Sequence, residues 1–224
     1  MLTLAIDTAA NFCSACVWDG QRVLGAEERD IGRGHAEQLV ATVERALAAA
    51  GRGFPDICRV AVTVGPGSFT GIRVGVAAAR GFGLALGVPV VGVTTLEALA
   101  ADAGELAEGP LAVAIHGGRG QVFIQSFAAD GAPLGAPAAV AAGDAASAVA
   151  PSVRFLAGNA AADVAAALGR PVGTGLDRAT GAVATIARLG ERAGRPPVPL
   201  YLRGADARPQ AGFALPRAGT ETAR

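Results

Sequence analysis

The sequence has 224 residues, a hydrophobic fraction of 51% and a formal net charge of zero. This length suits one large domain or two small ones, and the neutral balance argues against a chain that holds nucleic acid by itself, which would show a basic stripe. Three cysteines form no disulfide framework. The apolar N-terminus reaches Asp7 without a basic segment, so we expect no signal peptide, no membrane span and a cytoplasmic location.

The first half of the chain predicts an antiparallel opening followed by alternating strands and helices. A strand over 2–6 ends at Asp7-Thr8, and a strand over 12–18 is joined to a third over 21–28 by the tight-turn pair Asp19-Gly20. This order favours a mixed sheet with helices on its faces. The later elements predicted in this half are a helix over 34–50, a strand over 58–64, a helix over 70–87, a strand over 88–93 and a helix ending near 103.

A second unit begins near residue 108 and repeats the strand, turn and strand of the opening. The further elements predicted are strands over 111–115, 121–128 and 153–157, helices over 144–150, 160–168 and 180–192, and a loop with an edge strand over 131–143. We therefore predict an α/β fold of two related subdomains, residues 1–107 and 108–203, with a flexible tail over 204–224.

The predicted helix over 70–87 is apolar almost all round, and its only charges are Arg73 and Arg80. Small residues recur along it at a spacing of four: Gly71, Gly75, Ala79, Gly83 and Gly87. Such a row allows another backbone to come close. Either the row packs on the chain's own sheet, or the sheet covers one side of the helix and another subunit covers the other. A membrane helix is the weakest alternative because charged and small residues interrupt the apolar run.

Two stretches are candidates for binding phosphate or metal. Asp7-Thr8, at the end of the first strand, can hold a magnesium ion on nucleotide phosphates, or Asp7 can close an Asx-turn. The loop over 65–71 opens a helix and suits an anion, but it lacks the lysine and spacing of a P-loop, which favours a structural turn.

The cysteines and histidines give no metal or redox site. Cys13 and Cys16 lie three apart on a strand, so they point to opposite faces. His35 and His116 have no second histidine at ligand spacing, and no serine stands in a nucleophile-elbow pattern. We predict no metal site and no catalytic residue.

Several segments together resemble the TsaB (YeaZ) family. They are Leu4–Ala9, Cys13-Ser14, the run 65–73, Gly92–Leu96 and Tyr201-Leu202-Arg203. The resemblance implies an actin-like ATPase fold (ribonuclease H-like) of two related halves. The family-motif residues that we carry over are Gly65, Pro66, Gly67, Ser68, Phe69, Thr70, Arg73, Arg119, Tyr201 and Arg203.

The resemblance also implies a function. TsaB-like proteins are the non-catalytic dimerisation subunit of the bacterial machinery that places a threonylcarbamoyl group on adenosine of tRNA. They pair with the catalytic subunit TsaD, are joined by the ATPase TsaE, form homodimers, and meet tRNA only through the complex. The isolated subunit needs no cofactor, whereas the complex uses ATP or ADP with magnesium, for which Asp7 and Thr8 are the candidates here.

In this family the first two helices of the N-terminal half form the dimer interface, which corresponds to 34–50 and 70–87 in this chain. The residues expected there are His35, Leu39, Val43, Leu47, Gly71, Ile72, Gly75, Val76, Ala79, Phe82 and Gly83.

The chain departs from its relatives at two points. The catalytic sister proteins carry a histidine pair on the first helix, where this chain has only His35. Relatives usually read Asp-Ala-Arg at the second hairpin, where this chain has His116-Gly117-Gly118-Arg119, and loss of the acid weakens the expectation of nucleotide binding. Two other functions stay open, a stand-alone ATP-binding or glycoprotease-like hydrolase and, with less support, a plain tRNA-binding protein.

Overall fold

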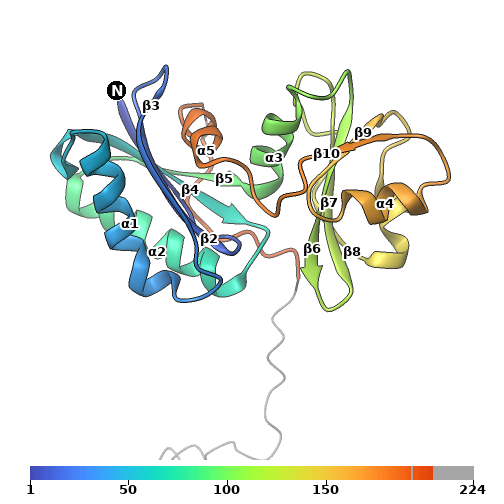
Figure 1. The fold of residues 1–224 in the computed structure, drawn as a ribbon, viewed down its shortest axis with the longest axis horizontal. Helices are drawn as coiled ribbons and strands as arrows, with labels where there is room; N and C mark the ends of the chain where they lie inside the picture. The colour runs from blue at the N-terminus through green and yellow to red at the C-terminus, as the bar shows by residue number, and fades with distance from the viewer. Residues whose placement is uncertain (193, 204–224) are drawn as a thin grey trace, which may run out of the picture.

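A computed structural model describes residues 1–192 and 194–203, so the predicted tail lies outside the described residues. Figure 1 shows two sheets, each flanked by helices, side by side along the long axis. The elements in chain order are β1 (Leu2–Asp7), β2 (Phe12–Trp18), β3 (Val23–Asp30), α1 (His35–Ala49), η1 (Phe54–Asp56), β4 (Ile57–Gly65), α2 (Phe69–Leu86), β5 (Val90–Thr94), α3 (Thr95–Ala103), β6 (Leu111–Gly118), β7 (Gln121–Phe127), β8 (Ala138–Ala141), η2 (Ala142–Ala148), β9 (Phe155–Ala157), α4 (Ala161–Ala167), β10 (Gly173–Gly175) and α5 (Val183–Gly190).

The two sheets have the same topology. The strand order is β3-β2-β1-β4-β5 in the first and β8-β7-β6-β9-β10 in the second. In each, three strands form an antiparallel meander. A later strand pairs in parallel with the first strand of the meander, and a last strand pairs in parallel with that one. This duplicated arrangement confirms the predicted actin-like fold of two related subdomains.

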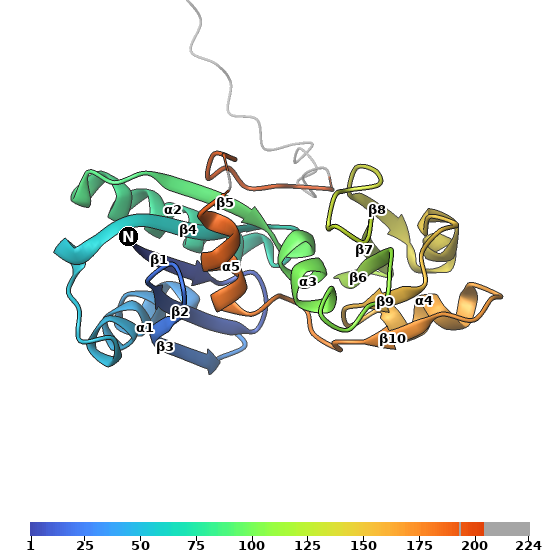
Figure 2. The same ribbon diagram turned by 90° about the horizontal axis from the view of Figure 1, so that it is seen from above.

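The first sheet is covered on both faces (Figures 1 and 2). On one face, Leu4, Ile6 and Val62 pack against α1 and α2 in the larger core cluster. On the other face, Ala5, Cys16 and Ala61 pack against Ile186 of α5. Because both faces are apolar, the central strands β1 and β4 read as continuous hydrophobic runs.

Helix α5 corrects the predicted subdomain boundary. The sequence analysis assigned everything over 108–203 to the second half, including this helix. In the structure α5 contacts β1, β2 and β4 of the first sheet. It returns because the second face of that sheet would otherwise expose its apolar side chains, and Figure 2 shows α5 lying over it beside α3.

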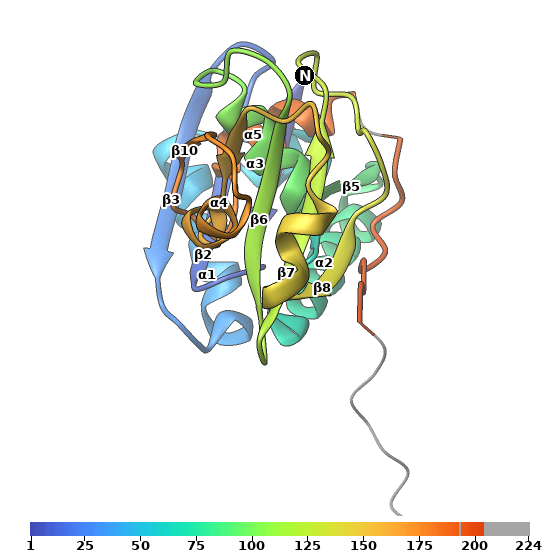
Figure 3. The same ribbon diagram turned by 90° about the vertical axis from the view of Figure 1, so that its right-hand side faces the viewer.

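The second sheet also has helices on both of its faces. Figure 3 shows α4 and η2 in front of it, with α3 on its other face. The helix predicted over 144–150 is the 3₁₀ helix η2, and the edge strand predicted within 131–143 is β8. The sequence analysis missed β10, because Gly173–Gly175 is short and carries no hydrophobic residue that would signal a strand.

The small-residue row of α2 faces the chain's own sheet, so the first explanation of that row is confirmed. A Cβ atom at Gly71 would lie 2.0 Å from the carbonyl oxygen of Thr8, and one at Gly83 would lie 2.1 Å from Cγ2 of Val90. The row therefore lets α2 approach β1 and β5 closely, and it is not open to another subunit. Among the described residues, α2 is the one helix long and apolar enough, by length and composition, to cross a membrane, and one side of it packs on the first sheet.

Candidate functional site

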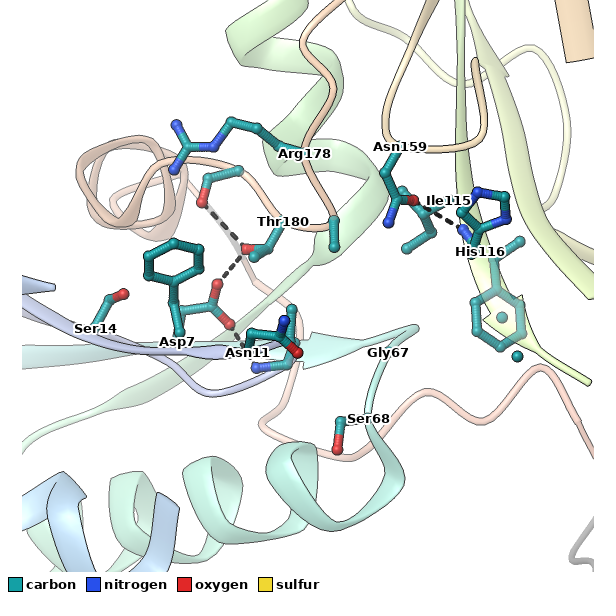
Figure 4. Close-up of a pocket in the computed structure, with 18 of the residues that line it drawn as sticks. Asp7, Asn11, Ser14, Gly67, Ser68, Ile115, His116, Asn159, Arg178 and Thr180 are labelled. Atoms are coloured by element: carbon teal, nitrogen blue, oxygen red, sulfur yellow. Dashed lines mark hydrogen bonds between the residues drawn. The ribbon is translucent and has the colours of Figure 1, made fainter. Parts of the chain in front are cut away.

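A cleft of about 960 Å³ lies between the two halves. Its walls come from the ends of β1 and β2, the turn before α2, the end of β6 and the segment 177–181 that leads to α5. Figure 4 shows Asp7, Asn11 and Ser14 on the side of the first sheet, and His116 and Asn159 on the side of the second. In position this cleft corresponds to the expected nucleotide site, so its side chains decide whether such a ligand fits.

Asp7 is buried at the floor of the cleft and is already hydrogen-bonded through both oxygens. Oδ1 accepts from the backbone N–H of Ala9 at 2.9 Å, and Oδ2 accepts from the hydroxyl of Thr180 (Figure 4). The first of these is the Asx-turn bond that the sequence analysis considered. Burial is the largest influence on this carboxyl group and raises its pKa, which favours the neutral form.

The state of Asp7 fits a magnesium-bound nucleotide poorly. A carboxyl group binds magnesium in its ionised form, whereas burial favours the neutral form of Asp7 and each of its oxygens already accepts one hydrogen bond. The second half supplies His116 at the hairpin where an acid was expected. Within residues 1–192 and 194–203, no group of three or more His, Cys, Asp or Glu side chains is arranged to hold a metal ion.

The glycine-rich turn is structural, as the sequence analysis favoured. The backbone N–H of Ser68 donates to the carbonyl of Ala9 at 2.7 Å, and its hydroxyl caps α2 by accepting from the N–H of Gly71 at 3.2 Å. The hydroxyl of Thr8 donates to the carbonyl of Gly71 at 2.7 Å. Gly67 and Gly71 let the turn and the start of α2 come close to the residues that follow β1. A Cβ atom at either glycine would lie within 2.4 Å of a backbone oxygen of that segment.

Two family motifs that are far apart in the sequence meet beside the cleft. The guanidinium group of Arg73 lies 3.7 Å from the ring centroid of Phe69, and its Nε donates to the hydroxyl of Tyr201 at 2.8 Å. The two rings are 5.1 Å apart. Arg203 lies 5.7 Å from the ring centroid of Phe123 in the second half. Sequence patterns alone do not predict this contact, because Arg73 and Tyr201 lie 128 residues apart along the chain.

The remaining family-motif residues hold the turn or lie at the second hairpin. Gly65 has a φ of 106°, which favours glycine, and Pro66 is buried behind it. Thr70 is exposed in the first turn of α2. Arg119 lies at the tip between β6 and β7 with a φ of 53°, about one residue from the place expected for the family's arginine.

His35, Cys13 and Cys16 are buried within the fold, whereas His116 is exposed at the cleft. His35 is buried with Nε2 3.2 Å from the carbonyl oxygen of Phe12, while His116 lies in the other half, 3.7 Å from Asp163. Cys13 contacts Thr42 of α1, and Cys16 contacts Val183 at the start of α5, so they point to opposite faces as predicted. Burial raises the pKa of the Cys16 thiol to about 12, which keeps it protonated.

Most residues predicted to form the subunit interface are buried within their own chain. The buried ones are His35, Leu39, Val43, Leu47, Gly71, Ile72, Gly75, Val76, Ala79 and Gly83. Phe82 is half-buried and stacks on Phe54 at 5.3 Å. The predicted set therefore names mainly the core-facing side of α1 and α2, and the interface itself stays a prediction.

The outward side of the same two helices carries exposed apolar residues among the charged side chains of Glu37, Glu44, Arg45, Arg73 and Arg80. Leu84 is 88% exposed and Val40 of α1 is 50% exposed. We call the exposed set Val40, Ala77, Gly81, Leu84 and Ala85 the outer α1–α2 face. A leucine this exposed, beside further small apolar residues, is typical of an interaction surface.

Comparison with known proteins identifies the family. The family model described as "TsaD: tRNA N6-adenosine threonylcarbamoyltransferase" matches residues 28–185. YeaZ from Pseudomonas aeruginosa superposes with a TM-score of 0.77 at 26% identity, covering 90% of this chain and 99% of that chain. The tRNA threonylcarbamoyladenosine biosynthesis protein TsaB of Escherichia coli (strain K12) is 38% identical over 103 residues. The chain belongs to the TsaB (YeaZ) family.

The relatives differ in how far they align. The match to E. coli TsaB covers 46% of this chain and 44% of that protein, so under half of its length is spanned. The uncharacterized protein Rv3421c of Mycobacterium tuberculosis is 37% identical over 211 residues, which cover 93% of this chain and 94% of that protein. The TsaB name thus comes from a match over under half of the chain, whereas the matches that span nearly all of it are to Rv3421c in sequence and to YeaZ in structure.

Proposed function

We propose that this chain is a non-catalytic interaction subunit required for threonylcarbamoylation of adenosine in tRNA. In this proposal it pairs through the outer α1–α2 face with a larger, TsaD-like catalytic protein, and a TsaE-like ATPase joins the pair. The observation that carries the proposal is that Leu84 is 88% exposed on α2. The opposite side of this helix is already buried in the core of the first half. The TsaB names of the relatives and the TsaD family model support the process.

The outer α1–α2 face has the chemistry of a helix-to-helix contact. Ala77, Gly81 and Ala85 are small, so a partner helix can approach closely, and Val40 and Leu84 project as larger apolar side chains. Arg73 and Arg80 are the only charges on α2. Arg80 is exposed between Ala77 and Leu84 on this side of α2, so a partner must accommodate one charge beside the apolar side chains. A second copy of the chain can use the same face, and we include this homodimer in the proposal.

The proposed lack of catalysis rests on the side chains of the two helices and the cleft. Helix α1 carries His35 alone, and that imidazole is bonded to the carbonyl of Phe12. Asp7 is hydrogen-bonded within the fold. We therefore propose that the isolated subunit needs no cofactor and that ATP or ADP with magnesium acts in the complex. We also propose that the subunit meets tRNA through the complex and that it is cytoplasmic.

The test is pairing with the TsaD protein of the same organism. Leu84→Asp places a charge in the middle of the outer α1–α2 face, and we expect it to weaken the complex at least tenfold in isothermal titration. Leu106→Asp is the matched control, because Leu106 is 57% exposed on the loop after α3, away from this face. Unchanged circular dichroism excludes misfolding. Full-strength binding by Leu84→Asp would overturn the proposed interface.

The cleft keeps one rival open, a stand-alone ATP-binding or hydrolytic protein. Its volume of about 960 Å³ is large enough for a nucleotide. Titration of the isolated chain with ATP and magnesium separates the two proposals. Tight binding that Asp7→Ala abolishes would favour the rival, whereas we expect no saturable binding.

A further inference from the structure

The described part of the chain has two exposed aromatic side chains, and they contact each other. Phe69 is 47% exposed and Tyr201, the only tyrosine of the sequence, is 42% exposed. Their ring centroids lie 5.1 Å apart. In a chain with an aromatic content of only 4%, two solvent-facing rings at one place need an explanation beyond core packing. We call Phe69, Arg73, Tyr201 and Arg203 the aromatic–arginine cluster.

The cluster is cationic. The only charged side chains of α2 are Arg73 and Arg80, and the only one over 198–203 is Arg203. Arg73 lies against the Phe69 ring and donates one hydrogen bond, from Nε to Tyr201. A guanidinium group has five N–H donors, so those on its outer edge can still reach an anion such as a phosphate.

Aromatic rings next to arginine have a specific use in recognition. Unstacked bases of RNA loops stack on aromatic rings and on guanidinium planes, while arginine also contacts the neighbouring phosphates. An acidic protein segment would use the arginines but has no need of two half-exposed aromatic rings beside them. The combination therefore favours RNA over an acidic protein partner.

The position of the cluster is compatible with the proposed pairing. Phe69 and Leu84 are fifteen residues apart on one helix, which corresponds to about 22 Å. Phe69 and Arg203 also line the cleft, and Figure 1 shows the last described residues passing the start of α2 toward the end of β6. A partner on the outer α1–α2 face can therefore leave the cluster accessible.

We propose that the aromatic–arginine cluster is an RNA contact that stacks an unpaired loop base of tRNA and holds an adjacent phosphate. This inference rests on the proposed function for its choice of RNA. The neutral net charge limits the affinity of the isolated chain, so the contact adds to binding by the complex and is measurable alone only at low salt.

The experiment measures the affinity of the full-length chain for an unmodified tRNA transcript at low ionic strength, by fluorescence anisotropy. Tyr201→Leu and Phe69→Leu remove a ring but keep apolar volume, and each is expected to raise the apparent Kd about tenfold. Arg73→Gln is expected to weaken binding and lower the salt dependence by about one counterion. Arg52→Gln removes an exposed arginine beyond α1 and should leave the affinity unchanged.

One further variant separates base stacking from a structural role. Tyr201→Phe keeps the ring but loses the hydroxyl that accepts from Arg73, so we expect it to bind like the unaltered chain. A loss equal to that of Tyr201→Leu, equal binding by all variants, or no binding by the unaltered chain would each overturn the inference. The outcome is independent of pairing, because the Leu84→Asp titration reports the proposed function separately.

Discussion

At the scale of single residues, Asp7 shows how a motif carboxylate becomes part of the structure. The sequence identified the position, because an acid that ends an apolar strand stands out. It could not identify the partner, because Thr180 lies 173 residues away along the chain. Two outcomes were weighed for this residue, a metal ligand and a turn-forming acceptor, and the observed bond to Ala9 is that of the turn.

The buried carboxyl group predicts a pH dependence of stability. Burial raises the pKa of Asp7 above its ordinary value of 3.8, so between that value and the raised pKa the folded state binds more protons than the unfolded state. The free energy of unfolding therefore falls as pH rises through this window, by at most about 1.4 kcal/mol per pH unit. Above the raised pKa, Asp7 adds no further pH dependence.

Asp7→Asn should remove this fall, because an amide keeps the acceptor for Ala9 and supplies a donor for Thr180 without a charge. We expect the variant to gain stability relative to the unaltered chain as pH rises from 4 to 7, measured by urea unfolding at each pH. Asp144→Asn, on the exposed η2, is the control and should follow the unaltered chain. Parallel curves for Asp7→Asn would contradict the assignment.

At the scale of elements, α2 explains why the sequence located helices well but not their contacts. The helix predicted over 70–87 is Phe69–Leu86 in the structure, since Ser68 caps its start and Gly87, with a φ of 67°, ends it. The four-residue spacing of small residues, which is visible in the local sequence, predicts that another segment approaches this side of α2 closely. What approaches is set by the tertiary structure, and here it is the end of β1.

Two glycines of the same helix make a matched test of that close approach. Gly71→Ala brings a methyl group against the carbonyl of Thr8, where backbone cannot move cheaply, and should lower the free energy of unfolding by about 2 kcal/mol or more. A Cβ atom at Gly81 would have no neighbouring atom within 4 Å. Gly81→Ala should therefore raise the free energy of unfolding by about 1 kcal/mol, because alanine has the higher helix propensity. Urea unfolding measures both, and equal effects would contradict the packing described.

At the scale of the whole molecule, the two halves are joined by helices that belong to both. Helix α3 contributes Leu96 and Leu99 to the core of the second half and Ala98 to the cluster around α5. Asp102 of α3 accepts from the backbone N–H of Ala182 at 2.7 Å and from the hydroxyl of Thr185, which fixes the start of α5. The repeated opening of each half was predictable from local signals. The return of α5 was not, because it depends on which sheet face lacks cover.

This shared construction predicts that the halves unfold together. Ile186 comes from the C-terminal part of the chain but is fully buried against the first sheet, in the cluster on which Trp18 packs. Ile186→Ala should cost about 2–4 kcal/mol and shift the unfolding transition seen by Trp18, the only tryptophan. Val164→Ala, in the separate core of the second half, should shift that same transition because the halves are coupled.

For both variants, the unfolding curve measured by tryptophan fluorescence should coincide with the curve measured by far-UV circular dichroism. A Val164→Ala chain in which the Trp18 transition stays in place while the circular dichroism splits into two steps would mean that each half folds by itself and that α3 and α5 do not couple them.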